Sequence, residues 1–168
     1  TINSPNRFYE FDDVPSMFDF IEELRSVGGK PVGMKIVVGD LDALENMISY
    51  MKESGKGPDF ITVDGGEGGT GATYQELADS VGLPIQSALT VVDEMLRDYG
   101  VRERVKIIAS GKLITPDKIA IALAMGADLV NIARGFMISV GCIMAGVCHT
   151  NHCPAGVATT DKKLQDGL

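Results

Sequence analysis

The sequence lacks a surplus of positive charge, a long apolar run, and any cysteine outside one short segment. Its 15 Lys and Arg against 23 Asp and Glu give a net charge of −8, which argues against a nucleic-acid or anionic-membrane surface. No apolar stretch is long enough to span a bilayer, and no basic-then-apolar leader opens the chain. Both histidines stand among the cysteines, so a serine–histidine triad has no support. These absences favour a cytoplasmic protein of ordinary globular composition.

Apolar residues recur along the chain in the alternation that is typical of parallel βα units. Strands are expected at 32–38, 60–63, 105–109 and 129–132, separated by helices, with a further helix from about residue 14. This pattern fits either an open doubly wound sheet or half of a (β/α)8 barrel, because a closed barrel needs at least about 200 residues. The 168 residues are therefore expected to form a single partial domain.

A glycine-rich loop, Gly65-Gly66-Glu67-Gly68-Gly69-Thr70-Gly71, follows the second expected strand. Ligands bind at the carboxyl ends of parallel strands, where backbone N–H groups of such a loop can meet an anion or a flat ring. No Lys-Ser or Lys-Thr pair follows, so the loop is not a P-loop. A surface loop without a ligand is the alternative. Asp64 and Glu67 are expected either to orient a substrate amine or to cap this loop.

Two further strand ends combine glycine with a cation. Ser110-Gly111-Lys112 ends the third expected strand, and Ala133-Arg134-Gly135 follows the fourth. Neighbouring tips of this kind predict a phosphate site, with ordinary surface cations as the alternative. Lys35 interrupts the apolar first strand. It either lies beside a ring that becomes negative on reduction, as a flavin does, or forms an ion pair with a carboxylate such as Asp64.

All three cysteines lie in the segment 142–153, as Cys142, Cys148 and Cys153 in the spacing C-x5-C-x4-C. An odd number of thiols in one segment indicates a ligand set rather than a disulfide framework. Zinc would need His149 or His152 as a fourth ligand, whereas a cluster of three irons needs one thiolate per iron. Free thiols are the third alternative.

Taken together, these residues resemble the FMN-binding barrel of the glutamate synthase family. The likeness covers nearly the whole chain and matches its four strands to strands five to eight of that barrel, so that the fold expected is the carboxy-terminal half of a TIM (β/α)8 barrel. The matching segments are Gly33-Met-Lys35, 63–72, 108–112, 133–136 and 141–154, and the segment 3–7 is similar to the loop before the fifth strand.

The resemblance implies an oxidoreductase that transfers ammonia reductively to 2-oxoglutarate, through 2-iminoglutarate, with FMN and a 3Fe-4S cluster. It implies Cys142, Cys148 and Cys153 as cluster ligands, and Lys35 and Glu67 as catalytic residues. The FMN contacts that it implies are Lys35, Gly65, Gly66, Gly68, Gly69, Ser110, Gly111, Lys112, Arg134 and Gly135. It further implies an electron-donor protein or an NAD(P)H-linked subunit as a partner, and no nucleic acid or membrane.

The sequence also departs from the family pattern. The first four barrel strands are absent from it, as is a glutaminase domain with its amino-terminal cysteine, so nothing in it releases ammonia from glutamine. Phe8 replaces a frequent histidine, and Thr73-Tyr74 replace a small residue and proline. We expect an isolated segment to be inactive and to belong with a missing barrel half, in the same or another chain. Two other functions stay open: a non-catalytic phosphate- or flavin-binding barrel fragment, and another FMN or phosphate barrel enzyme such as the inosine-monophosphate dehydrogenase type, which the cysteine triplet disfavours.

Overall fold

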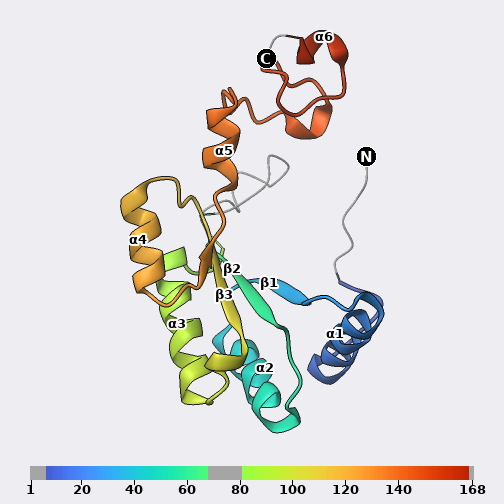
Figure 1. Cartoon of the computed structure of the whole chain (residues 1–168), viewed down its shortest axis with the longest axis vertical. Coiled ribbons are helices and arrows are strands. Elements are labelled where there is room, and N and C mark those ends of the chain that lie inside the picture. The colour runs from blue at the N-terminus through green and yellow to red at the C-terminus, as the bar shows by residue number, and fades with distance from the viewer. Residues whose placement is uncertain (1–6, 68–80, 167–168) are drawn as a thin grey trace.

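A computed structural model of the chain describes residues 7–67 and 81–166, and its parallel βα units are shown in Figure 1. The strands are β1 (Gly33–Val37), β2 (Phe60–Asp64), β3 (Lys106–Ser110) and β4 (Leu129–Val130). The helices are α1 (Val14–Gly28), α2 (Leu41–Ser54), α3 (Ile85–Asp98), α4 (Pro116–Ala124), α5 (Ala133–Ser139) and α6 (Lys162–Gln165), with short 3-10 turns η1 (Arg102–Arg104) and η2 (Cys148–Thr150).

The four strands form one parallel sheet in the order β1-β2-β3-β4. In a doubly wound sheet the strand order reverses at a switch point, whereas consecutive strands of a barrel are always neighbours. The prediction of parallel βα units that form part of a TIM barrel is therefore confirmed. The fourth strand is shorter than the expected 129–132, because Ile132 leaves the extended region, at ψ 63°, where the chain turns into α5.

The two faces of the sheet differ in what they carry. Ile61, Val63, Ile107 and Ala109 alternate onto one face and are buried with residues of α2 and α3 in the core. On the other face, residues that are paired across β1, β2 and β3 form two rows. The first row is Lys35, Thr62 and Ile108, and the second, nearer the carboxyl ends, is Val37, Asp64 and Ser110. The second face thus brings polar side chains toward the carboxyl ends of the strands.

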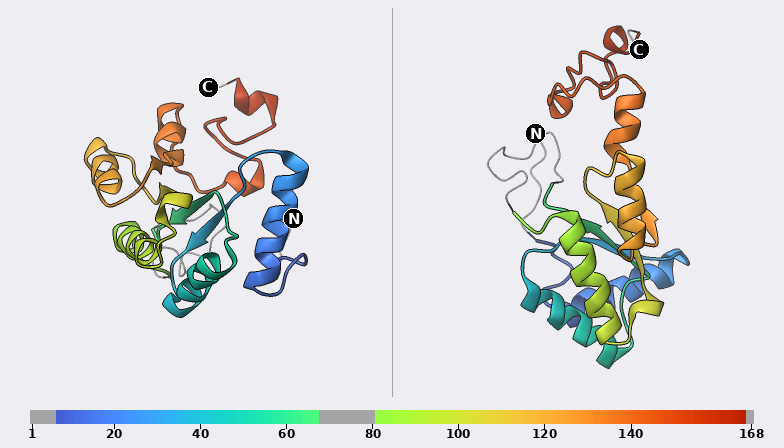
Figure 2. Two further views of the ribbon diagram at one scale, coloured as in Figure 1. Left: turned by 60° about the horizontal axis from the view of Figure 1, so that its bottom comes forward. Right: turned by 90° about the vertical axis from the view of Figure 1, so that its left-hand side faces the viewer.

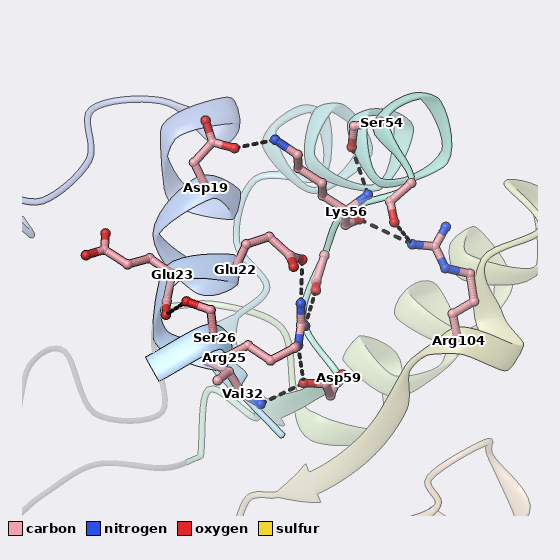
Figure 3. A network of polar contacts seen from close by, with 12 residues as sticks. Asp19, Glu22, Glu23, Arg25, Ser26, Val32, Ser54, Lys56, Asp59 and Arg104 are labelled. Atoms are coloured by element: carbon pink, nitrogen blue, oxygen red, sulfur yellow. Dashed lines mark hydrogen bonds and ion pairs between the residues drawn. The ribbon is translucent and has the colours of Figure 1, made fainter. Parts of the chain in front are cut away.

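An aspartate directly before β2, Asp59, links β1 and β2 at the amino-terminal ends of the strands. Asp59 donates its N–H to the Val32 carbonyl at 2.8 Å, and its Oδ2 accepts the Val32 N–H at 2.7 Å. Figure 3 shows the Arg25 guanidinium reaching from α1 to the same carboxylate, with Nε 3.0 Å from Oδ2. Arg25 also pairs with Glu22 on its own helix. Helix α1 is thereby fixed to the beginning of the sheet.

The same arrangement recurs two strands further on. Asp128, directly before β4, donates its N–H to the Ile107 carbonyl and accepts the Ile107 N–H through Oδ2, both at 2.8 Å. The half-buried Arg102 contacts Oδ2 of Asp128 at 2.9 Å and Oδ1 of Asp93 on α3 at 2.5 Å through its guanidinium. These contacts stabilise the amino-terminal ends of the strands. None of them occupies the carboxyl ends, where ligands bind in parallel βα folds.

Helix α5 and the segment that follows it extend beyond the carboxyl ends of the strands, on the side away from α2 (Figures 1 and 2). Across residues 7–67 and 81–166, every helix is too short or too polar to pass through a bilayer.

Candidate functional site

A cavity of about 520 Å³ opens at the carboxyl ends of the strands. This volume lies within the range of small-molecule and cofactor sites. The side chains that line it with polar groups are Lys35, Asp64, Glu67, Ser110, Lys112, Asn131 and Arg134. The apolar part of the lining comes from Val37, Val81, Leu113, Ile114, Ile132 and Met137. Every residue of the predicted flavin site that the structure describes lies on this one cavity.

Lys35 and Asp64 form an ion pair across β1 and β2, with the ammonium nitrogen 3.0 Å from Oδ2. The Asp64 side chain is 17% exposed and that of Lys35 is 64% exposed, so the carboxylate is the more fixed of the two groups. The expected alternative for Lys35, pairing with Asp64, is thus observed. Both side chains also line the cavity, so this pairing keeps the ammonium at the site rather than removing it.

The first two glycines of the glycine-rich loop use their amides inside the protein. The N–H of Gly65 donates to the Ser110 carbonyl, and that of Gly66 donates to the Leu83 carbonyl, both at 2.8 Å. Neither of these amides is left to bind an anion. Gly68 and Gly69, which the sequence also assigns to the cofactor, lie outside the described residues.

The Ser110-Gly111-Lys112 turn has an unusual backbone. Gly111 has a φ of 147° and Lys112 a φ of 48°, which places a side-chain-bearing residue in the left-handed region. Such residues are uncommon outside glycine and gather at functional turns. The turn sets Lys112 on the cavity, and the buried Leu113 both lines the cavity and packs in the core.

Arg134 and Gly135 lie in the first turn of α5 and line the same cavity. Arg134 is exposed on the cavity, and its Nη1 lies 3.9 Å from Sδ of Met144 in the cysteine segment. A Cβ added at Gly135 would lie 2.8 Å from Cγ2 of Ile132, so the turn into α5 itself requires glycine there. The two cation-bearing strand tips that the sequence paired are therefore brought to the same cavity.

Sequence reasoning missed the apolar part of the lining, Met137 included, and one polar residue, Asn131. Asn131 follows β4 directly, and its N–H donates to the Ala109 carbonyl at 2.8 Å. A polar residue at the carboxyl end of a barrel strand is a signal that was available from the sequence. Met137 gave no such signal, because in the sequence it is one of several apolar residues in a short helix.

The three thiols are not gathered into one group. Cys142 is half-buried, Cys148 is exposed and Cys153 is buried. Within the described ranges, no three His, Cys, Asp or Glu side chains lie close enough together to hold a metal ion. In this arrangement the residues fit neither a zinc site nor a three-iron cluster.

Cys153 nevertheless sits in a preformed loop. Hydrogen bonds from backbone N–H groups, above all that of Ala158, lower the pKa of its thiol, although burial acts against them. Asn151 closes the loop, since its Oδ1 accepts the Thr160 N–H at 2.8 Å and its carbonyl accepts the Thr159 hydroxyl at 2.6 Å. Cys142 instead follows α5, and its N–H donates a hydrogen bond to the Met137 carbonyl at 2.9 Å.

Comparison with known proteins gives one family. The family model described as the conserved region in glutamate synthase matches residues 1–168. The chain is 67% identical over 168 residues to the glutamate synthase large subunit-like protein YerD of Bacillus subtilis, covering all of this chain and 32% of that protein. It is 36% identical over 161 residues to an archaeal-type glutamate synthase [NADPH] of Thermotoga maritima, covering 95% of this chain and 31% of that protein. The chain thus spans about a third of the length of these relatives.

Proposed function

The chain belongs to the glutamate synthase family, and from that premise we propose that its strand-end cavity is the FMN site of a glutamate synthase-like oxidoreductase. The observation that carries the proposal is the convergence of Lys112 and Arg134, from the ends of two neighbouring βα units, on one cavity of about 520 Å³. Phosphate-bearing cofactors are bound in this way at the carboxyl ends of parallel strands.

The charges of the cavity support an anionic cofactor. Lys35, Lys112 and Arg134 outnumber Asp64 and Glu67, three cations against two carboxylates, in a chain whose net charge is −8. A locally positive cleft in an acidic protein attracts phosphate or carboxylate groups. We assign Lys112 and Arg134, together with Ser110, Gly111 and Gly135, to the FMN phosphate.

The apolar lining suits the isoalloxazine ring. Val37, Ile114 and Met137 supply flat apolar contact of the kind that cofactor pockets use. FMN, when bound, supplies the two-electron reduction that the protein side chains lack. Lys35, held by Asp64, would keep a positive charge beside the ring and raise its electron affinity.

The proposed reaction is the reductive amination of 2-oxoglutarate to glutamate. Its dicarboxylate substrate is compatible with the same positive cleft, and the electron donor and the source of ammonia are assigned to other parts of the protein or to other subunits. The relatives that are named glutamate synthases support the reaction class.

We retain Cys142, Cys148 and Cys153 as the proposed ligands of a 3Fe-4S cluster, on their spacing and on the family resemblance. The observed arrangement requires the three thiols to come closer together before they can share a cluster. No step of the reaction is assigned to the cluster.

The two outer strands of the sheet, β1 and β4, each have an unpaired edge among the described residues. Exposed edges are normally covered. Near β4, Leu129 is 57% exposed and Leu123 on α4 is 46% exposed. We propose that the remaining half of the barrel covers these edges, since the relatives are about three times as long as this chain.

A non-catalytic cofactor-binding role is the second candidate. One observation favours it: both carboxylates of the cavity are engaged internally, Asp64 with Lys35 and Glu67 with the backbone N–H of Ile85. A protein that binds FMN stoichiometrically but does not form glutamate from 2-oxoglutarate and ammonia would support this candidate.

The test is cofactor content. The natural polypeptide that contains this sequence should be purified without oxygen, and its flavin, iron and zinc should be measured. We expect stoichiometric FMN and iron, and little or no FMN on residues 1–168 alone. A colourless protein that holds zinc and no flavin would refute the proposal.

A further inference from the structure

We infer that Glu67 is a positioning residue, which caps helix α3 from a distance and so holds three strand ends in the shape that the cavity needs. This inference deepens the proposed function and rests on it for the identity of the cofactor. The arrangement of Glu67 itself is independent of that function.

Helix α3 has no cap of its own. Its N-cap residue is Pro84, whose side chain makes no hydrogen bond. The first N–H groups of a helix need partners from outside the helix. Glu67, 18 residues earlier, supplies one, because its Oε1 and Oε2 lie 3.1 Å and 3.0 Å from the Ile85 nitrogen. A carboxylate at this end of the helix is also favoured by the helix dipole.

Gly65 makes room for this carboxylate, and Gly111 packs closely against Ile85 at the start of α3. A Cβ added at Gly65 would lie 2.1 Å from Oε2 of Glu67 and 2.7 Å from the Ile85 nitrogen. A Cβ at Gly111 would lie 3.4 Å from the same oxygen and 3.1 Å from Cβ of Ile85. The glycine at position 65 is therefore required by the backbone at the start of α3, whatever ligand the cavity holds, and it leaves room for the Glu67 carboxylate.

Backbone hydrogen bonds continue the connection to the neighbouring strands. The Gly65 N–H binds the Ser110 carbonyl at the end of β3, and the Gly66 N–H binds the Leu83 carbonyl. Leu83 in turn donates to the Val38 carbonyl after β1 at 2.7 Å. Glu67 closes this set of bonds onto α3, so the ends of β1, β2 and β3 are held against one helix.

This geometry distinguishes between the two expected roles of Glu67. A catalytic acid or base has to reach the substrate with a carboxylate oxygen. Here both oxygens are directed to the same backbone N–H group, that of Ile85. Removing the side chain should therefore disturb the Ser110–Lys112 tip that meets the proposed phosphate, rather than a proton transfer.

The experiment uses the natural polypeptide with Glu67→Gln and Glu67→Ala. The Gln amide oxygen still accepts the Ile85 N–H, so FMN affinity and the pH dependence of kcat should stay close to wild type. Glu67→Ala should weaken FMN binding by about tenfold, the effect of losing a cap worth about 1.4 kcal/mol. At saturating FMN, kcat should recover.

Gly65→Ala should weaken FMN binding at least as much as Glu67→Ala, because its Cβ would meet both the Glu67 carboxylate and the Ile85 nitrogen. The double variant should then be weakened by less than the sum of the two single effects, since both substitutions act on the start of α3. Asp13→Ala is the matched control. It removes the side-chain cap of α1, is not among the residues that line the cavity, and should leave FMN affinity unchanged.

The inference is overturned if Glu67→Gln abolishes turnover with FMN fully bound, or removes one limb of the pH profile. It is also overturned if Gly65→Ala and Glu67→Ala weaken FMN binding additively. Hydrogen exchange of the Ile85 amide provides a separate readout. If the wild type holds no FMN, the proposed function fails, but faster exchange in Glu67→Ala still reports the cap, and unchanged exchange refutes it.

Discussion

The ammonium nitrogen of Lys35 lies 3.0 Å from Oδ2 of Asp64 across the neighbouring strands β1 and β2, at the wall of the strand-end cavity. Because the more buried Asp64 fixes the pair, the positive charge of Lys35 is held at one place instead of moving through solvent. The pair thus sets the local electrostatic potential of the proposed flavin site.

Replacing Lys35 with Met should lower the reduction potential of the bound flavin, because a positive charge that stabilises the reduced ring is removed. The expected shift is about 30 mV or more, which corresponds to about 1.4 kcal/mol for a two-electron couple. Asp64→Asn should shift the potential upward. Lys30→Met is the control. It makes the same charge change before the amino-terminal end of β1 and should leave the reduction potential of the flavin unchanged. Equal potentials in all four proteins would contradict the role of Lys35.

Replacing Arg102 with Met should lower the free energy of unfolding by about 3–5 kcal/mol, because it leaves Asp93 and Asp128 without their shared partner. The side chain of Arg102 is only 11% exposed. Arg97 binds the same Asp93 but is 58% exposed, so Arg97→Met should cost no more than about 1 kcal/mol. Urea unfolding of the natural polypeptide measures both, and similar losses for the two variants would be inconsistent with the network.

Stability should fall at acid pH through Asp59 and Asp128. Burial opposes the charge of each carboxylate, yet hydrogen bonds from Val32 or Ile107 and from an arginine hold its pKa below the usual value. A lowered folded-state pKa contributes stability that is present above the unfolded pKa of about 3.9 and is lost as the pH falls through the folded pKa. Unfolding midpoints should therefore be insensitive to these groups above about pH 5 and should decline below about pH 4. Asp128→Asn should make that decline shallower, and an unchanged slope would count against this origin.

Replacing Cys148 with Ser should remove the iron from the natural polypeptide while the far-ultraviolet circular dichroism stays the same. A three-iron cluster has no thiolate to spare, so loss of one should empty the site. His149→Ala is informative beside it, because a Cys3His zinc site needs a histidine whereas the cluster does not. Iron retained in Cys148→Ser, or metal lost in His149→Ala, would contradict the proposed ligands.

How much the sequence could predict depended on the range of the interaction. Asp40 as the cap of α2 and Pro116 at the start of α4 involve neighbours along the chain, and both were visible as local patterns. Lys35 was visible because a charge interrupts an apolar strand. By contrast, the contact of Glu67 with Ile85 joins residues that are 18 positions apart and depends on how β2 and α3 pack. No local sequence pattern predicts it.

The repeated contacts of Asp59 and Asp128 were missed for a similar reason. An aspartate before a strand is an ordinary turn residue in the sequence, and its meaning appears only when the neighbouring strand brings Val32 or Ile107 alongside. The cysteine segment shows the reverse case. Its spacing indicated a ligand set, but the spacing of residues along a chain does not place their sulfur atoms together in space.

The central claim, that Lys112 and Arg134 bind the phosphate of FMN, is tested most directly by comparing FMN with riboflavin. Dissociation constants of both ligands should be measured on the natural polypeptide and on its Lys112→Ala/Arg134→Ala variant. We expect the wild type to prefer FMN by about a hundredfold or more, since charge-assisted hydrogen bonds to the phosphate contribute about 1.5–3 kcal/mol each. In the variant this preference should nearly vanish while riboflavin binding is unchanged. A preference for FMN that survives the double substitution would contradict the account.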